Sequence, residues 1–191
     1  NTATHTTIAE DGTHPFGFKL STITASSAAV TVTSPSGSPP SETIDFTGVP
    51  DDQDKINLGF TLPDGSSDGI TMTAVTGSPA AAGEFQIGTD AATTAANFQA
   101  ALASVIADKS QTTLVAASNN QAANEFFNGQ GDQVMRVQGP NFATATSLVV
   151  ADPTTTVIWY QGGDSSDPRS AIQARVDDTQ TVNYGAQANE S

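Results

Sequence analysis

The spacing of the apolar residues changes near the middle of the chain, and this change constrains the fold more than any other feature. A first stretch has an apolar residue at every second position: Ile56, Leu58, Phe60 and Leu62. Over residues 91–107, apolar residues recur instead at intervals of three and four. A period of two is typical of a strand with one buried face, and a period near 3.6 is typical of a helix. The sequence therefore predicts sheet followed by a long helix.

The alternating stretch continues into a predicted hairpin. Ile70 and Met72 alternate with threonines after the connector of residues 63–69, which is rich in Asp, Gly and Ser. These residue types accept turn dihedrals, so residues 56–73 are expected to form two antiparallel strands. Shorter alternating runs predict further strands at residues 15–22, 29–33, 44–46 and 85–87. The proline-rich residues 34–41 are expected to form a loop, because proline cannot donate to a ladder.

Two helices are expected in the middle of the chain. The long one covers about 91–107, with Thr89 or Asp90 as its N-cap. A shorter one is expected at about 119–127, because Ser118 and Gln121 have the spacing of a capping box. Asn128-Gly129 would end this second helix. Residues 112–116, between the two helices, are predicted to form a strand.

The last third of the chain returns to strand patterns. Residues 156–160 are β-branched and aromatic, and residues 172–176 alternate before a turn at 177–179 and a strand at 181–184. No strand–helix–strand alternation typical of a parallel sheet is found. The expected fold class is α+β, with a mostly antiparallel β-sheet, one long helix and one shorter helix.

Composition limits the partners that this chain can have. Of its 191 residues, 20 are Asp or Glu and 6 are Lys or Arg, which gives a formal net charge of −14. Nucleic-acid binding requires clustered cations, so the charge argues against it, and against an anionic membrane surface. No run approaches the length of a membrane span. The absence of Cys excludes disulfides, thiol nucleophiles, Cys-ligated zinc and iron–sulfur clusters.

No pattern typical of an active site is found. His5 and His14 do not have the spacing of a helical metal pair, and we interpret them as ordinary surface histidines. No phosphate loop and no G-x-S-x-G elbow occurs. Acidic residues cluster at 51–54, 64–69 and 164–168; calcium binding is one interpretation, and solvated turns are the favoured one. We expect no enzyme activity and no catalytic, cofactor-binding or metal-binding residue.

Aromatic residues leave one binding hypothesis open. They make up 6% of the chain, too few for the aromatic-lined cleft of a glycosidase. Trp159 and Tyr160 are neighbours on a predicted strand, so they point to opposite faces. An exposed ring could stack on a sugar, although packing against a loop is favoured. A glycan-binding or surface-binding adhesion module is therefore the alternative function.

The two ends of the chain carry a resemblance to a known family. The C-terminal part contains residues 156–164, then Asp167-Pro168-Arg169-Ser170, and then the stretch from Val182-Asn183-Tyr184-Gly185 to Ala188-Asn189-Glu190. It resembles the segment that precedes the C-terminal helix in alphaproteobacterial (rhizobial-type) flagellins and related hook-associated proteins. Residues 7–11 and 15–20 resemble the matching outbound segment. Residues 60–65 and 87–102 are similar to the central insert of those flagellins.

The resemblance implies a structural role in the bacterial flagellum. It suggests the variable, outward-projecting domain of a filament subunit, or the corresponding domain of a hook–filament junction protein. Such a domain would serve motility, be secreted by the flagellar type III route and remain extracellular. Its partners would be other flagellin-family subunits, contacted through terminal helices that this sequence lacks, and the isolated domain is expected to be monomeric. Absent disulfides and few lysines suit export as an unfolded chain.

The resemblance also implies an arrangement of the chain. We expect a piece of a longer protein, with residues near Asn1 and Ser191 close together because both would join one helical stem. The whole chain, 1–191, would be one central outer region. A division into two subdomains stays open, with about 1–50 plus 150–191 in one and about 51–149 in the other.

Overall fold

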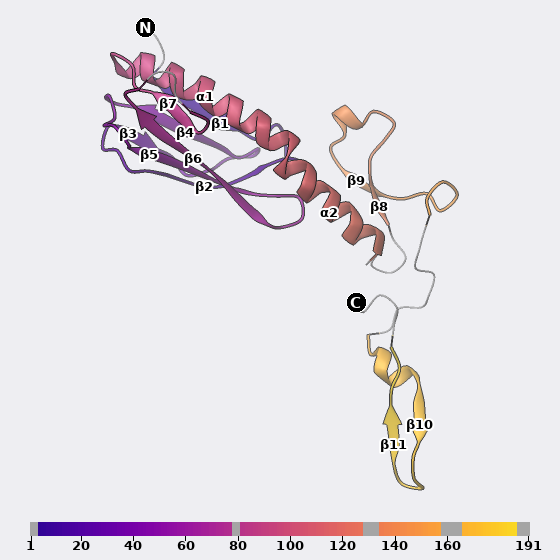
Figure 1. Ribbon diagram of the computed structural model, residues 1–191. Helices are drawn as coiled ribbons and strands as arrows, with labels where there is room; N and C mark the ends of the chain where they lie inside the picture. Colours follow the sequence, from indigo (N-terminus) through magenta and orange to yellow (C-terminus); the bar gives the residue numbers. More distant parts are fainter. Residues whose placement is uncertain (1–3, 78–80, 128–133, 158–165, 187–191) are drawn as a thin grey trace. The chain divides into compact units, whose positions relative to one another are not determined.

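The computed structural model describes residues 4–77, 81–127, 134–157 and 166–186. Its contacts divide the chain into two compact units, Asn1–Asn119 and Asn120–Ser191, which we describe separately. The model confirms an α+β fold with mostly antiparallel sheets and a long helix (Figure 1).

Unit 1 contains two sheets. The larger has four strands in the order β2-β5-β6-β7, namely Lys19–Ala25, Lys55–Thr61, Ser67–Val75 and Glu84–Gln86. The smaller has three strands in the order β1-β4-β3, namely His5–Ala9, Ser41–Phe46 and Val30–Val32. All neighbours are antiparallel except β6 and β7, which run parallel. The strands predicted at 29–33, 44–46 and 85–87 are therefore confirmed, with small shifts of their ends.

The predicted hairpin at 56–73 is the β5–β6 pair. Its register runs without a shift from Lys55 opposite Thr73 to Thr61 opposite Ser67. The Asp64 carboxylate accepts a hydrogen bond from the Ser66 N–H at 3.1 Å, and Gly65 has a φ of 79°, which glycine tolerates best. The connector thus forms the turn that its Asp, Gly and Ser content predicts.

Strand β2 begins later than predicted. Residues 15–18 lie outside the strand, where Gly17 has a φ of 76° that interrupts an extended chain. Within β2 the register shifts between Leu20 and Thr22, so a β-bulge changes which residues face inward. A Cβ on Gly59, in the partner strand, would collide with the Thr22 hydroxyl. The Thr22 side chain therefore leaves room only for glycine at position 59.

Helix α1 spans Ala91–Gln111, four residues beyond its predicted end at 107. Of the two expected N-caps, Asp90 is the one observed, because its carboxylate accepts a hydrogen bond from the Thr93 N–H at 2.7 Å. The predicted apolar face is confirmed: Ala95, Phe98 and Leu102 are buried. Figure 1 shows the helix lying along both sheets of the unit, where it contacts β1, β4, β6 and β7.

The expected strand at 112–116 and the expected helix start at 119 are both wrong. Helix α2 spans Thr113–Phe127, so most of that stretch is helical, and Ser118 lies inside the helix rather than at its cap. Thr112 separates α1 from α2 with φ −116° and ψ −84°. The β-branched residues favour strand locally, but extending an existing helix costs much less than starting a new element. The predicted stop at Asn128-Gly129 lies outside the described residues.

One core fills the space between the two sheets and α1. Its centre is an aromatic cluster in which the Phe98 ring lies 5.4 Å from Phe46 and 5.2 Å from Phe85. Each of the three rings comes from a different element, β4, β7 or α1. The inward residues of β5 and β6 complete this core: Ile56, Leu58, Phe60, Ile70, Met72 and Ala74.

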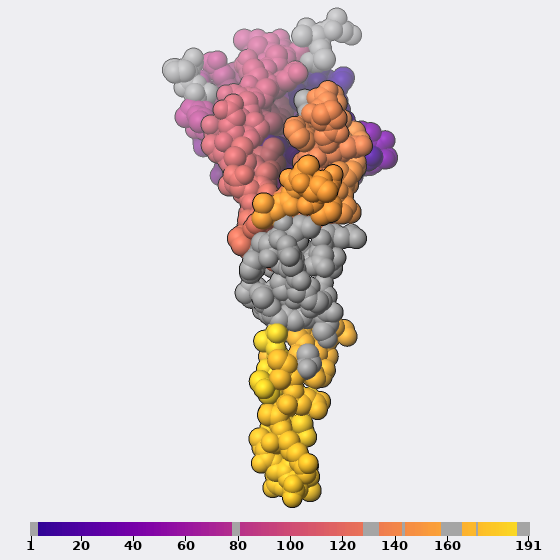
Figure 2. Space-filling view, turned by 90° about the vertical axis from the view of Figure 1, so that its right-hand side faces the viewer, coloured from indigo at the N-terminus to yellow at the C-terminus, as the bar shows by residue number. Residues whose placement is uncertain are grey.

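Unit 2 contains two short hairpins. Strands β8, Met135–Val137, and β9, Leu148–Val150, form an antiparallel pair that the sequence analysis did not predict. Strands β10, Gln173–Arg175, and β11, Thr181–Asn183, form the second predicted hairpin, which is confirmed (yellow in Figures 1 and 2). Two short 3-10 helices, Phe142–Thr144 and Pro168–Ala171, lie between these strands.

The first residues of the strand predicted at 156–160 and the division into subdomains differ from what the structure shows. Of the strand predicted at 156–160, Thr156 and Val157 are not in a strand, and the remainder lies outside the described residues. The unit boundary at Asn119 differs from the subdomains considered above. It differs because the β2–β5 ladder joins residues before 50 to residues after it. The residues nearest the two termini, 1–3 and 187–191, also lie outside the described part.

Candidate functional site: an open groove between β6, β7 and α1

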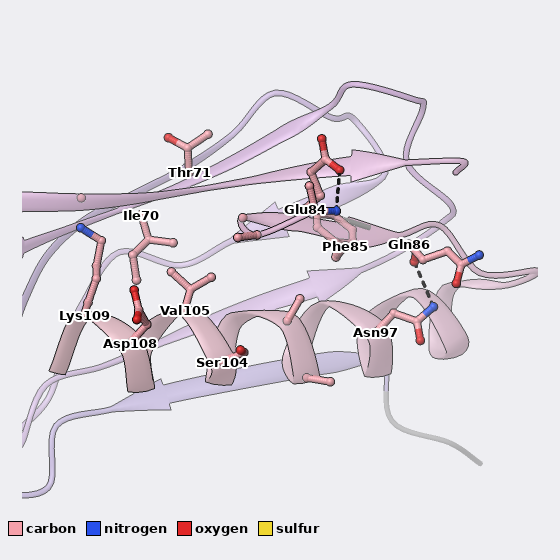
Figure 3. A pocket seen from close by; sticks show the side chains of 16 residues that line it. Ile70, Thr71, Glu84, Phe85, Gln86, Asn97, Ser104, Val105, Asp108 and Lys109 are labelled. Carbon is pink, nitrogen blue, oxygen red and sulfur yellow. Dashed lines mark hydrogen bonds between the residues drawn. The ribbon is translucent and has the colours of Figure 1, made fainter. Parts of the chain in front are cut away.

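Unit 1 contains a groove. It has a volume of about 980 Å³ and is open to solvent, with β6 and the residues leading into β7 on one side and α1 on the other (Figure 3). Ile70 and Val105 form an apolar part of its wall. Its polar side chains include Thr71, Glu84, Asn97, Ser104, Asp108 and Lys109.

An ion pair joins the two sides of the groove. The Lys109 ammonium at the end of α1 lies 2.6 Å from the Asp68 carboxylate on β6. Burial raises the pKa of Asp68, but hydrogen bonds from Lys109 and from the Gly69 N–H outweigh it, and the net shift of this pKa is downward. The Asp68 carboxylate therefore stays ionised at neutral pH.

The other polar groups of the groove do not form a catalytic arrangement. The Glu84 carboxylate accepts a hydrogen bond from the Ala81 N–H at 2.9 Å, and the Asn97 amide donates to the Gln86 carbonyl at 3.0 Å (dashed in Figure 3). Ser104 has no histidine beside it among the described residues that line the groove. Nucleophilic catalysis would require a base within hydrogen-bonding reach of the hydroxyl. The described side chains that line the groove therefore show no serine activated by a histidine.

A buried carboxyl group lies elsewhere, in the smaller sheet. Glu42 on β4 is 1% exposed, and neither of its carboxylate oxygens has a hydrogen-bond partner in the described structure. Desolvation by burial raises the pKa of Glu42 to about 7. The Thr6 hydroxyl on the neighbouring β1 is also buried without a partner. Sequence analysis missed Glu42, although it shares the two-residue period of Ile44 and Phe46 and so faces the core with them.

A second ion pair, between Glu10 and Lys19, also escaped sequence analysis. The Glu10 carboxylate lies 2.9 Å from the Lys19 ammonium and accepts a hydrogen bond from the Leu20 N–H at 2.9 Å. It thus fixes the start of β2 beside the end of β1. No sequence motif marks such a pair.

The two histidines are placed differently from each other. His5 is an exposed residue at the start of β1. His14 lies 3.0 Å from the Asp11 carboxylate, and its other ring nitrogen accepts a hydrogen bond from the Phe16 N–H at 3.3 Å. These contacts orient the His14 ring within a local turn. Its side chain is 12% exposed, so the interpretation of His14 as an ordinary surface histidine is wrong, whereas exposed His5 agrees with it.

The acidic clusters form turn contacts where the structure describes them. The Asp54 carboxylate accepts hydrogen bonds from the Asp51 N–H at 2.9 Å and from the Ser26 hydroxyl at 3.2 Å. Hydrogen bonds, chiefly from Ser27, lower the pKa of Asp54. The Asp52 carboxylate accepts from the Thr76 N–H at 2.9 Å. Within the described ranges, no group of three or more His, Asp or Glu residues is arranged to hold a metal ion.

Several sequence-based candidates lie outside the described residues. These are Trp159 and Tyr160, the first two residues of the acidic stretch 164–168, and the end of the chain from 187 onward. The glycan-binding hypothesis based on Trp159 or Tyr160 therefore stays a prediction. None of the described helices is long and apolar enough to cross a membrane.

Comparison with protein-family models, with curated proteins and with solved structures gives no significant match to this chain.

Proposed function

We propose that this chain is an outward-projecting structural domain of a flagellin-family filament subunit in the bacterial flagellum. The observation that carries the proposal is the C-terminal motif Val182-Asn183-Tyr184-Gly185, followed by Ala188-Asn189-Glu190. This motif resembles the segment before the C-terminal helix of such subunits, and residues 7–11 and 15–20 resemble the matching outbound segment. Its partners would be other subunits of the filament, and its location would be extracellular.

The described part of the motif has a structural reason for its glycine. Gly185 follows β11, and its N–H donates a hydrogen bond to the Arg169 carbonyl at 3.2 Å. A Cβ at this position would collide with the Pro168 carbonyl oxygen. The Tyr184-Gly185 step therefore holds the hairpin against the short helix at Pro168–Ala171, and a side chain at position 185 would disrupt this contact.

The composition supports a structural role. A chain without Cys needs no oxidation after export, and its six cations are few. The net charge of −14 would keep neighbouring copies apart over about 8 Å at physiological salt. The open groove of unit 1, without a described nucleophile and base in contact, also favours a structural or binding role over catalysis.

Immunogold labelling tests the proposal. Antibodies raised against the 191-residue chain are applied to intact cells of the source bacterium, with a strain lacking the gene as the control. Labelling along the whole filament is expected. Labelling confined to one ring at the filament base would instead identify a junction protein. Labelling of the cell body alone would overturn the flagellar proposal.

A further inference from the structure

The groove of unit 1 runs beside an unpaired sheet edge. Strand β6 spans Ser67–Val75, but β7 pairs only with its last three residues, Thr73–Val75. Among the described residues, no strand pairs with residues 67–72 on the side away from β5. An open edge of this kind can accept an additional strand.

The hydrogen-bond pattern identifies the backbone groups that this edge presents. Ala74 exchanges two hydrogen bonds with the chain leading into β5, donating to the Asp54 carbonyl and accepting from the Gln53 N–H, both at 2.8 Å. The Thr73 N–H points the other way and donates to the Gly83 carbonyl at 2.9 Å. Because backbone groups alternate along a strand, the Thr71 N–H and the Gly69 carbonyl also face away from β5. The Gly69 N–H is already bound by the Asp68 carboxylate at 2.8 Å.

The groove gives such a strand an apolar wall. Ile70 is 3% exposed and faces α1, whose half-buried Val105 lies across from it (Figure 3). Ala101 on α1 is small and also lines the groove. An added strand could therefore direct every second side chain toward α1 and the others toward solvent. This is the general arrangement in which peptides bind by extending a sheet.

The acidic side chains of the groove favour a cationic peptide. Two carboxylates line it, those of Glu84 and Asp108, together with one ammonium, that of Lys109, which is already paired with the Asp68 carboxylate. The Asp108 side chain is exposed. We propose that this groove binds an extended cationic peptide segment, which adds to the edge of β6 as a short strand. The proposal does not depend on the flagellar function.

A labelled peptide tests this inference on the whole 191-residue chain. The probe is a capped fluorescent peptide of about seven alternating Lys and Val residues, the length of an ordinary strand. One control peptide replaces Lys by Glu, and another methylates alternate backbone nitrogens to remove donors. We expect saturable binding, measured by fluorescence anisotropy, for the unmodified cationic peptide alone. The absence of saturable binding, or equal binding of the methylated peptide, would overturn the proposal.

Matched charge reversals separate the groove from general attraction to an acidic chain. Asp108→Lys should weaken binding about fivefold or more, because an attractive contact becomes a repulsive one. Asp51→Lys makes the same change at an exposed residue outside the groove and should alter affinity by less than about twofold. Equal effects of the two substitutions would show nonspecific binding and refute the site.

The edge itself is tested at Thr71. Thr71→Pro removes the N–H that faces the groove, so it should abolish peptide binding while the β5–β6 ladder persists. Circular dichroism checks that this variant folds. In addition, exchange of the Thr71 amide proton in the unmodified protein, followed by NMR, should slow at least about tenfold on saturation with the cationic peptide. Unchanged exchange at Thr71 under saturation would refute strand addition, whether or not the proline variant folds.

Discussion

Replacing Glu42 by Gln should stabilise unit 1 at neutral and alkaline pH. The Glu42 carboxyl is 1% exposed and unpartnered, and burial raises its pKa from 4.5 to about 7. Between these values the unfolded chain has lost the proton while the folded chain keeps it. Raising the pH therefore favours unfolding over this window. Below about pH 4.5 both states are protonated, and above about pH 7 both are ionised, so the effect stops at each end.

The magnitude follows from the size of the shift. A difference of about 2.5 pKa units, at about 1.4 kcal/mol per unit, corresponds to about 3 kcal/mol lost between pH 4.5 and pH 7. Glutamine has nearly the same shape as protonated glutamate and no charge. Glu42→Gln should thus match the unmodified protein at about pH 4 and exceed its free energy of unfolding by about 3 kcal/mol at pH 8.

Urea unfolding followed by far-ultraviolet circular dichroism measures this difference, because the helical signal comes largely from α1 and α2. The matched control is Asp108→Asn, at an exposed residue, which changes the net charge equally. Its difference from the unmodified protein should stay nearly constant with pH. A constant difference for Glu42→Gln as well, or a variant less stable at pH 8, would refute the assignment of an uncompensated buried carboxyl.

Three further substitutions test the packing of unit 1. Phe98→Ala should lower the free energy of unfolding by about 3–5 kcal/mol, measured by urea denaturation, because the ring is fully buried between Phe46 and Phe85. Gly59→Ala should cost about 1–3 kcal/mol by the same assay, and adding Thr22→Ala should restore most of it, because the added Cβ collides with the Thr22 hydroxyl. Asp90→Ala should lower the melting temperature and Asp90→Ser should not, since only the second retains an acceptor for the Thr93 N–H. Equal melting temperatures for the two Asp90 variants would contradict the capping role.

Local periodicity predicted most elements of unit 1 because the elements themselves are regular. Strands β5 and β6 bury every second residue, and α1 buries Ala95, Phe98 and Leu102 in helical phase. Such patterns require no knowledge of distant residues. The wrong predictions concern residues whose local preference for strand or helix differs from the structure of the neighbouring chain. Residues 113–116 favour strand by composition, yet they continue the helical rod that α1 begins.

The groove could not be predicted in the same way, because it depends on where one strand stops. Strand β7 pairs only with Thr73–Val75 of β6, and the chain reaches this edge at Gly83, which has a φ of 81°. No residue pattern within β6 indicates that its first half lacks a second partner strand. The ion pair of Asp68 with Lys109 joins residues 41 positions apart in the sequence, which no local pattern reveals.

The carboxylates of the groove affect two kinds of strand pairing, that between copies of this chain and that with a cationic peptide. An open edge beside an apolar wall is a template for pairing between copies of the same chain, and natural proteins oppose this with charge. Two copies meeting edge to edge would bring the Glu84 and Asp108 carboxylates of one copy near those of the other. Like charges disfavour that pairing, whereas a cationic strand would meet the same groups as partners. A charge that opposes pairing between copies would thus also favour a cationic strand over an anionic one.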